Sequence, residues 1–417
     1  MKVFVVCLTG SEVRRLVGAT ETKVSLEEYA ARADEPCRRL SAVLYQAREE
    51  ENRFVTGVRE IMVMSEGAVR RLTHVLRRGA YDAPGDLVEA GVPERVLPMS
   101  SEYPTNRLGL ARWMTDRGHP LTARVAVNRI WKLHFGRGLV ATPEDFGAQG
   151  ALPSHPELLD YLALRFMESG WDRKALHRLI ALSATYRQDS KPQSSDLAVD
   201  PENRWLSRGP RHRLLAEQIR DEALAATGLL VRTIGGKSVK PYQPPGVWEE
   251  AGTGKSYTPD KGENLYRRSL YTFWRRTAPP PSMLSFDATS REVCTAKREV
   301  TTTPLQALVL MNDVQFIEAS RVMAQGLVQR HSHDVFAVAT EAFRRLINRR
   351  PDARELETLG RLYREQLDFY RSHADAAEKL VSVGDSPRDK AVASIELAAV
   401  TFLVSTLMNH DEFVMKR

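Results

Sequence analysis

Cysteine is scarce in this 417-residue chain, and long apolar runs are missing. The three cysteines, Cys7, Cys37 and Cys294, are odd in number and widely spaced, and neither C-x-x-C nor C-x-x-C-H occurs. This pattern excludes a disulfide framework, a thiolate zinc cluster and c-type haem attachment in this chain. The apolar start, residues 3–8, is too short for a membrane span and lacks the flanks of a signal peptide. The sequence therefore predicts neither a membrane span nor an export signal.

Two short motifs imitate nucleotide-binding sites without their essential partners. In GTGKS, residues 252–256, a phosphate-binding loop would need glycine where Glu249 stands, and the sequence predicts no strand before it. The DFG within residues 142–147 is accompanied by no glycine-rich loop, strand lysine or HRD. Internal repeats and heptad runs are also missing. These absences argue against nucleotide binding, kinase chemistry and a repeat architecture.

Arginine is the residue in excess. Hydrophobic residues make up 42% and charged residues 27% of the chain, as in ordinary globular proteins. The formal charge is +7, the isoelectric point is about 9.3, and only 13 of the 60 basic residues are lysine. The guanidinium group suits phosphate, sulfate and carboxylate, so the excess indicates an anionic ligand or a nucleic acid. Ion pairing on helix surfaces is the alternative origin.

The hydrophobic periodicity predicts a mainly α protein, a multi-helix globular domain with a small β or irregular arm. Residues 1–57 are expected to form an N-terminal helical remnant of an upstream domain, with Ser25 as a helix cap. Short apolar runs broken by Gly and Pro predict a strand-and-turn arm over residues 58–104. The main helical domain is expected over residues 105–412, with a Gly- and Pro-rich loop at 235–264. Its helices are predicted at about 108–118, 125–136, 154–166, 173–187, 210–230, 303–329, 334–348, 352–377 and 391–408.

Polar residues gather on the second of these helices and in the turn after it. The turn at residues 136–138, Gly-Arg-Gly, offers backbone amides and a guanidinium group to an anion, although such a turn often serves only to end a helix. The ligand-binding candidates of this stretch are Arg124, Asn128, Arg129, His134 and Arg137. Acid–base candidates follow at Asp145, His155 and Glu157, because carboxylates and imidazoles are the usual proton-transfer groups.

A second polar cluster lies farther along the chain. Glu217 and Asp221 are four apart on a predicted helix, where they either face a pocket or form ion pairs with neighbouring arginines. The cluster completes the ligand-binding candidates with Arg268, Arg291 and Arg298. It adds two acid–base candidates, Asp221 and Glu292. A satisfied buried polar network would use the same residue types. No metal site is predicted, because His331 and His333 would fall on different faces of a helix.

Several long blocks of the sequence form a recognisable pattern. They include HPLTARVAVNRIWKLHFGRGLV, SHPELLDYLA, FMESGWDRKALHRLI, GGKSVKPYQPPGVWE and TTTPLQALVLMND. Together they resemble a planctomycete-type domain of unknown function called PSD-one. The resemblance covers roughly residues 61–412 and consists of long blocks, not of one short signature.

The resemblance implies a place in a larger protein. Relatives of this type carry the domain as the C-terminal part of exported surface proteins, behind a cytochrome c-like domain and a second conserved domain. Those upstream domains are then the expected partners, and haem c is expected only on them, so no cofactor is expected in this chain. The implied location is extracytoplasmic, in the cell envelope, although this chain shows no signal peptide. The resemblance implies no established activity.

Three functions stay open. The first is a binding or scaffold module that presents an Arg-rich polar groove to an anionic ligand, such as an anionic polysaccharide, or to its upstream redox domains. The second is a hydrolase or oxidoreductase acting on polysaccharide through the acid–base candidates. The third, nucleic-acid binding, lacks a recognisable reading motif, and the basic residues are spread along the chain. The gathering of five arginines around one concave surface would favour the first two over the third, namely Arg124, Arg129, Arg137, Arg268 and Arg291.

Overall fold

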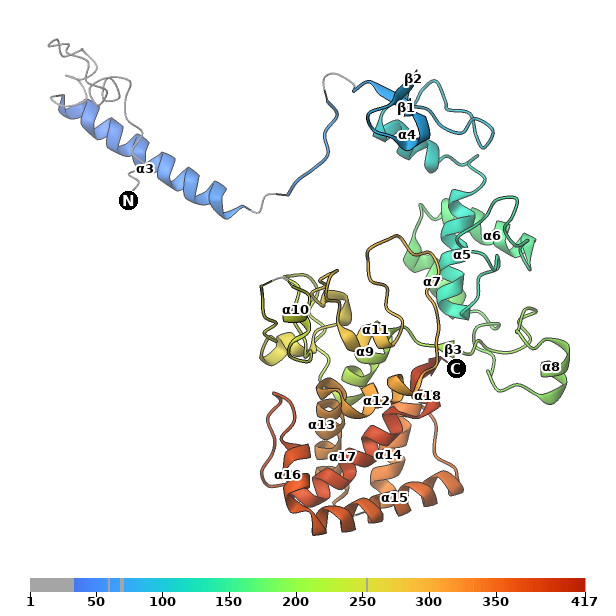
Figure 1. The fold of residues 1–417 in the computed structure, drawn as a ribbon, viewed down its shortest axis with the longest axis vertical. Helices are drawn as coiled ribbons and strands as arrows, with labels where there is room; N and C mark the ends of the chain where they lie inside the picture. The colour runs from blue at the N-terminus through green and yellow to red at the C-terminus, as the bar shows by residue number, and fades with distance from the viewer. Residues whose placement is uncertain (1–33, 59–60, 68–70, 253, 333, 417) are drawn as a thin grey trace. The chain divides into compact units, whose positions relative to one another are not determined.

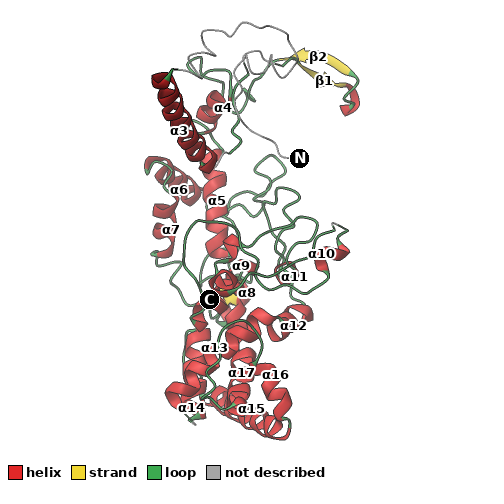
Figure 2. Cartoon of the chain, turned by 90° about the vertical axis from the view of Figure 1, so that its left-hand side faces the viewer, coloured by secondary structure: helices red, strands yellow, loops and turns green. Residues whose placement is uncertain are grey.

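The computed structural model describes residues 34–58, 61–67, 71–252, 254–332 and 334–416. Helices dominate these residues, and the described strands form two small antiparallel pairs (Figure 1, Figure 2). This confirms the prediction of a mainly α protein with a small β arm. The chain divides into two compact units, Met1–Glu89 and Ala90–Arg417. Among the described helices, none combines the length and apolar character needed to cross a membrane.

The first unit contains a long, exposed helix. Helix α3, Glu35–Gly57, begins at Asp34, whose carboxylate accepts a hydrogen bond from Cys37 N at 3.0 Å. A short polar side chain at this position satisfies an amide that the helix leaves unpaired. None of the residues of α3 is buried. The expected cap at Ser25 lies outside the described residues.

A β-hairpin follows in the same unit. Strand β1, Thr73–Leu76, pairs antiparallel with β2, Pro84–Val88, around a 3-10 turn at Arg77–Gly79. The ladder is irregular between His74 and Leu76, which fits a short edge hairpin. A small β arm is therefore present at Thr73–Val88, within the range predicted for strands and turns, whereas the apolar residues 61–64 form no strand.

Three helices near the start of the second unit share a small core. The helices of this region are α4 Arg107–Met114, α5 Thr122–Phe135, α6 Pro156–Glu168, α7 Arg173–Ala181 and, in the following loop, α8 Ser194–Val199. Val127, Leu162 and Leu176 bring α5, α6 and α7 together. Helix α7 ends six residues before the predicted position 187. The reason is Ser183, whose hydroxyl donates to Ile180 O at 2.7 Å and so competes with the helical bonds.

The larger part of the second unit is a helical body around α17. Its elements are α9 Ala216–Thr227, α11 Pro281–Ser285, α12 Pro304–Asn312, α13 Val314–His331, α14 Val335–Ile347, α15 Ala353–Ser372, α16 Ala374–Val381, α17 Ser394–Met408 and α18 Asp411–Val414. Helix α17 is apolar on nearly every side, and Leu397, Leu403 and Val404 are fully buried. It packs against α13, α14, α15 and α16 (Figure 1). An all-round apolar helix belongs at the centre of such a bundle.

Two predicted helices are each broken into two. The helix expected at 303–329 is interrupted at Asp313, which is extended and caps α13 by accepting from Gln315 N at 2.9 Å. The helix expected at 352–377 is interrupted at His373, whose ring bonds to Phe369 O at 3.0 Å. In both places a polar side chain takes a backbone group that would otherwise continue the helix.

The predicted helix over 210–230 begins later than expected. Strand β3, His212–Arg213, pairs with β4, Met415–Lys416, near the C-terminal end of the chain. Helix α9 starts only after this pairing, with Leu215 N donating to Gln218 Oε1 at 2.9 Å. A pairing across about 200 residues leaves no local signal in the sequence. In the described part of the predicted Gly- and Pro-rich loop, the short helix α10, Val247–Glu250, and the start of a 3-10 helix at Gly262–Tyr266 interrupt otherwise irregular chain.

Candidate functional site

A groove with a volume of about 660 Å³ lies beside α9. Its charged lining residues are Glu217, Asp221, Glu222, Arg232, Arg268, Arg291 and Arg298. The carboxyl groups come from α9, whereas the arginines come from three segments that follow it in the chain. The site is therefore assembled by tertiary structure.

Helix α9 is oriented by its apolar face. Ile219 and Ala223 are fully buried in the main core, so Asp221 and Glu222 remain at the groove. The buried Arg220 donates to Arg267 O at 2.9 Å and to three further acceptors, and it ties residues 265–269 to the helix. Burial lowers the pKa of Arg220 to about 10.

The segment tied to Arg220 carries one of the groove's arginines. Ser269 N donates to the Asp221 carboxylate at 2.7 Å, which holds the neighbouring Arg268 at the groove. Fully satisfied buried donors make such an arrangement rigid. Arg220 is thus a positioning residue for Arg268, in addition to lying 3.7 Å from the Asp221 carboxylate as an ion-pair partner.

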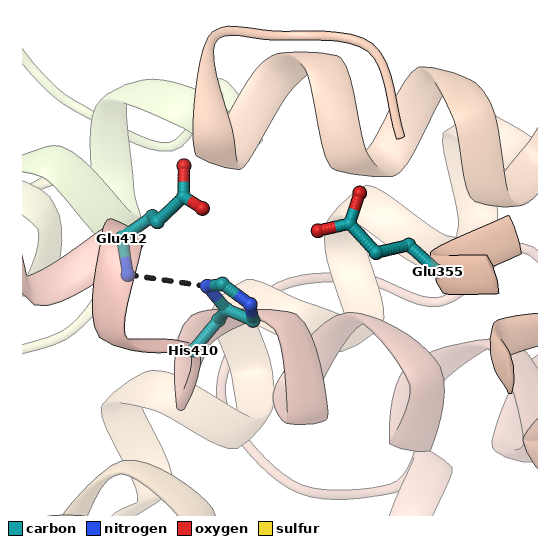
Figure 3. A group of neighbouring side chains, drawn as sticks. All are labelled: Glu355, His410 and Glu412. Atoms are coloured by element: carbon teal, nitrogen blue, oxygen red, sulfur yellow. Dashed lines mark hydrogen bonds between the residues drawn. The ribbon is translucent and has the colours of Figure 1, made fainter. Parts of the chain in front are cut away.

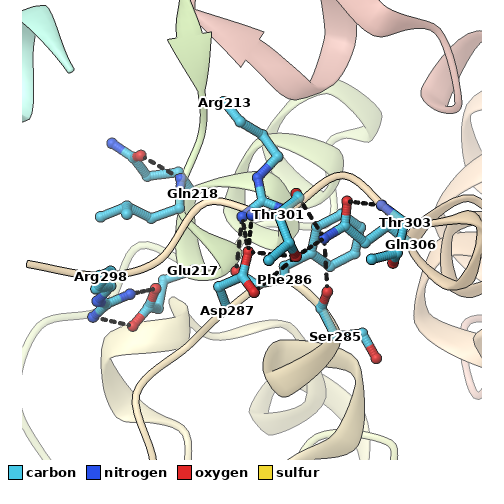
Figure 4. Close-up of polar contacts among 11 residues, drawn as sticks. Arg213, Glu217, Gln218, Ser285, Phe286, Asp287, Arg298, Thr301, Thr303 and Gln306 are labelled. Carbon is cyan, nitrogen blue, oxygen red and sulfur yellow. Dashed lines mark hydrogen bonds and ion pairs between the residues drawn. The ribbon is translucent and has the colours of Figure 1, made fainter.

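A polar network anchors the loop that brings Arg291 and Arg298 to the groove. Arg213 donates to the Asp287 carboxylate and, at 2.8 Å, to Thr301 O, while Thr301 N donates to Asp287 at 2.8 Å (Figure 4). Gln306 Nε2 donates to Ser285 O at 2.9 Å and thereby ties the loop to α12. Although burial opposes it, hydrogen bonding from Thr301 and Arg213 lowers the pKa of Asp287. The loop that carries Arg291 and Arg298 is therefore fixed at its two ends, at Asp287 and Thr301.

Two residues of this loop adopt a backbone conformation that L side chains rarely take. Asp287 has a φ of 59° and Arg291 a φ of 64°, both in the left-handed region. Such conformations cost free energy and persist only where the surroundings over-determine them. The Asp287 network supplies that constraint at one position, and stacking of the Arg291 guanidinium on Trp274, at 4.5 Å from the ring centroid, supplies it at the other.

The charged groups of the groove differ in their pairing. Arg298 forms two hydrogen bonds to the Glu217 carboxylate, at 2.8 and 3.0 Å (Figure 4). Burial acts against ionisation of Glu217, but these bonds outweigh it and lower the pKa. The pKa of Glu222 rises instead, to about 7, because burial is not compensated by a partner. Arg232, Arg268 and Arg291 line the groove and make no ion pair with any described residue, although the charge of Arg291 also contributes to lowering the pKa of Glu217.

Four of the sequence candidates meet in this groove, namely Asp221, Arg268, Arg291 and Arg298. Glu217 lines it with them while also pairing with Arg298, so both interpretations of the Glu217–Asp221 spacing describe part of the structure. Glu222 and Arg232 also line the groove but are not among the sequence candidates. A helix register anchored on Ile219 could have placed Glu222 at the edge of the buried face, but no local signal marks Arg232. Glu292 is exposed, outside the groove, and lies 3.9 Å from Arg276.

The other ligand-binding candidates lie on or after α5 and line no part of the groove. Arg124 pairs with Asp160 at 2.6 Å, and Arg137 pairs with Glu202. Arg129 is exposed on α5. His134 Nε2 bonds to His177 Nδ1 at 2.8 Å, and burial, followed by the charges of His177 and Lys416, lowers the pKa of His134.

The turn at residues 136–138 is packed against the chain's own side chains. A Cβ on Gly136 would lie 2.8 Å from the His212 ring, and one on Gly138 would lie 2.7 Å from the Asn128 amide. Asn128 is fully buried and bonds both the amide and the carbonyl of Val140. In this structure the turn ends a helix, the alternative to anion binding that the sequence left open.

The three remaining acid–base candidates also lie apart from the groove. Asp145 accepts a hydrogen bond from Gly147 N at 2.7 Å within a turn, and His155 Nδ1 bonds to Ser154 Oγ at 3.0 Å. Glu157 is exposed in the first turn of α6. The structure therefore separates these residues from Asp221.

One group of described residues has the donor types for a metal ion. Ligand atoms of Glu355, His410 and Glu412 lie within 4.8 Å of one another (Figure 3). The Arg349 guanidinium already donates to both carboxylates, at 2.6 Å in its shortest contact with each. Hydrogen bonds from Arg349 are the main reason that the pKa of Glu355 falls to about 2. Arg349 thus supplies the positive charge that these carboxylates would otherwise take from a metal ion, and it ties the starts of α15 and α18 together.

The comparisons with known proteins agree with the sequence resemblance. The family model PSD1, described as a protein of unknown function (DUF1553), matches residues 106–363. No curated protein and no solved structure matches this chain. The matched range includes every residue that lines the groove.

Proposed function

From the premise that this chain belongs to the PSD1 (DUF1553) family of unknown function, we propose that its groove binds an anionic ligand. The observation that carries the proposal is the presence of three arginines, Arg232, Arg268 and Arg291, that face one groove without an ion-pair partner among the described residues. Guanidinium groups bind carboxylate and sulfate with paired hydrogen bonds.

An anionic polysaccharide is the proposed ligand class. Arg268 and Arg291 are exposed, and Leu270, 74% exposed, lines the same groove, as suits a ligand with an apolar ring face and charged groups. The groove is also built on fixed backbone, because Arg220 and the Asp287 network hold its two walls. A preformed site loses less conformational entropy on binding.

The proposal extends to the protein's setting. We propose a binding or scaffold module in a cell-envelope protein, as the sequence resemblance implies, with a cytochrome c-like domain and a second conserved domain as its partners. Haem c belongs to those domains in the proposal. Arginine contacts to a surface polysaccharide would then hold the redox domains near the envelope.

The test is a titration of the purified chain by isothermal calorimetry. Polygalacturonate and dextran sulfate are the probes, neutral dextran is the uncharged control, and mixed-sequence DNA represents the third function. We expect Arg268→Gln combined with Arg291→Gln to weaken binding at least about tenfold, and rising salt to weaken it in the wild type. Arg129→Gln, an exposed arginine outside the groove, is the matched control and should bind like the wild type.

Two outcomes would refute this function. If polygalacturonate and dextran sulfate bind no more tightly than neutral dextran, the groove does not recognise an anionic ligand. Equal weakening by Arg129→Gln and by the groove variants would mean that binding follows net charge and not the groove. A preference for DNA over both polysaccharides would favour nucleic-acid binding instead.

Hydrolysis of the polysaccharide is a second candidate, favoured by Glu222. Its pKa of about 7 allows this carboxyl group to donate and regain a proton near neutral pH, while Glu217 stays ionised beside it in the groove. The same probes, assayed for new reducing ends, test this activity. Turnover that disappears in Glu222→Gln while binding persists would establish the hydrolase function. If the wild type shows no turnover, only the binding function remains.

A further inference from the structure

A second cavity, of about 380 Å³, lies where the loop between α16 and α17 meets α13. Its polar and charged lining residues are Arg321, Glu378, Ser382, Ser386, Arg388 and Lys390. None of them lines the groove beside α9. Whatever this cavity binds is therefore independent of the function proposed above.

Arg321, on α13, has one buried nitrogen without a partner. The side chain is 1% exposed, its Nε donates to Val383 O at 3.3 Å, and its Nη2 donates to Ser386 O at 2.7 Å. No described residue accepts a hydrogen bond from Nη1. An unmade hydrogen bond on a buried charged donor is costly, so it points to an acceptor that the protein itself does not supply.

The loop over this arginine is held in shape. Glu318 Oε1 accepts hydrogen bonds from Ser386 N at 2.6 Å and from Tyr266 Oη at 2.9 Å. Gly384 has a φ of 94°, and a Cβ at that position would lie 2.3 Å from the Glu318 carboxyl group. The close approach requires glycine, and it fixes the loop against α13. The cavity is thus preformed by fixed backbone.

The charges around the cavity favour an anion. Arg321, Arg388 and Lys390 contribute three cations, against the carboxylate of Glu378. Glu378 is already bound by Arg388 Nη1 and by Ser394 Oγ, both at 2.7 Å, and hydrogen bonding from Ser394 and Arg388 lowers its pKa. Arg388 Nε has no partner among the described residues. Arg321 and Arg388 therefore line the same cavity, and each has one buried nitrogen without a partner among the described residues.

The two other acidic residues of the loop bond elsewhere. Asp385 accepts from Gly262 N at 2.9 Å, and Asp389 accepts from Gln329 Nε2 at 2.8 Å. Glu318 lies 4.0 Å from Arg321 and compensates part of its charge, but its Oε2 also lacks a partner. The competing explanation is consequently a water molecule that bridges Arg321 Nη1 and Glu318 Oε2.

We propose that this cavity binds a compact oxyanion, sulfate or phosphate, either as a free ion or as an ester on a larger molecule. Arg321 Nη1 and Arg388 Nε donate hydrogen bonds to it from the protein side. Lys390 is exposed and adds a positive charge on the solvent side of the cavity. Charge-assisted bonds from fixed donors are the strongest recognition available to such an ion.

Calorimetric titration with sodium sulfate, sodium phosphate and glucose 6-phosphate, at constant ionic strength in sodium chloride, tests the proposal. We expect one saturable site that Lys390→Gln weakens at least about fivefold. Arg129→Gln, at an exposed position outside both this cavity and the groove beside α9, is the matched control and should change the affinity less than about twofold. Arg291→Gln reports any binding of the same ions in the groove. Glucose 6-phosphate binding with the same sensitivity to Lys390→Gln identifies an ester ligand, whereas binding of the inorganic ions alone identifies a free ion.

A crystal soaked in selenate locates the ion without relying on a buried variant that could fail to fold. An anomalous peak within hydrogen-bonding distance of Arg321 Nη1 is the expected result. Water in that place, sulfate binding unchanged by Lys390→Gln, or binding lost only in Arg291→Gln would each overturn the proposal.

Discussion

At the scale of single residues, the partner of a buried carboxyl group decides its protonation. Glu217 and Glu222 lie on the same helix and line the same groove. Arg298 bonds to Glu217 and lowers its pKa against the effect of burial, whereas burial alone raises the pKa of Glu222 to about 7. Of these two carboxyl groups, Glu217 therefore stays negatively charged and Glu222 titrates near neutral pH.

This difference predicts a pH-dependent stability. Since the pKa of Glu222 is about 7 in the folded chain and about 4.5 in the unfolded chain, its favourable contribution is complete below about pH 4.5 and is lost as the pH rises through 7. Urea unfolding of Glu222→Gln should therefore show a smaller fall in the free energy of unfolding between pH 5 and about 8 than the wild type. The exposed Glu365→Gln is the control and should follow the wild type. Parallel curves for Glu222→Gln and wild type would contradict the raised pKa.

At the scale of elements, side chains at helix ends decide where helices stop. Asp334 and Asp352 cap α14 and α15 close to the predicted starts. Asp313 does the same inside a stretch that is apolar enough to read as one helix, and it separates α12 from α13. The break turns α12 toward the loop that carries Arg291 and Arg298, because Gln306 on α12 binds Ser285 O and Thr301 O.

Removing this cap tests its role. Asp313→Ala should lower the free energy of unfolding by about 1 kcal/mol, because Gln315 N loses its acceptor. Asp313→Asn keeps an oxygen at the same place and should cost less. Urea denaturation of the two variants measures the difference. An alanine variant as stable as the wild type, or an asparagine variant as unstable as alanine, would show that the cap does not stabilise the break.

At the scale of the whole molecule, α17 holds the helical body together. Leu403→Ala, at a fully buried position of α17, should lower the free energy of unfolding by about 2–5 kcal/mol, through lost burial and the cavity left behind. Leu40, 71% exposed on α3, is the matched control, and Leu40→Ala should stay within about 0.5 kcal/mol of wild type. Chemical denaturation followed by circular dichroism provides the comparison. Similar losses in both variants would mean that α17 is not the centre of the stable core.

Much of this protein follows from its sequence alone. Periodicity and capping residues predicted the mainly α class, most of the helices and the hairpin region, because these depend on neighbours within a few residues. The stop at Gly136 was predicted for the same reason. Long sequence blocks also predicted the family, which the family model confirms.

The tertiary structure decided what no local pattern contains. The pairing of β3 with β4 joins residues about 200 apart and shortens α9, and the side chains of Asp313 and His373 break two apparently continuous helices. The groove forms only because Arg220 and the Asp287 network bring Arg268 and Arg291 to α9. Such convergence depends on long-range contacts among buried polar groups, whose partners are set by packing and not by spacing along the chain.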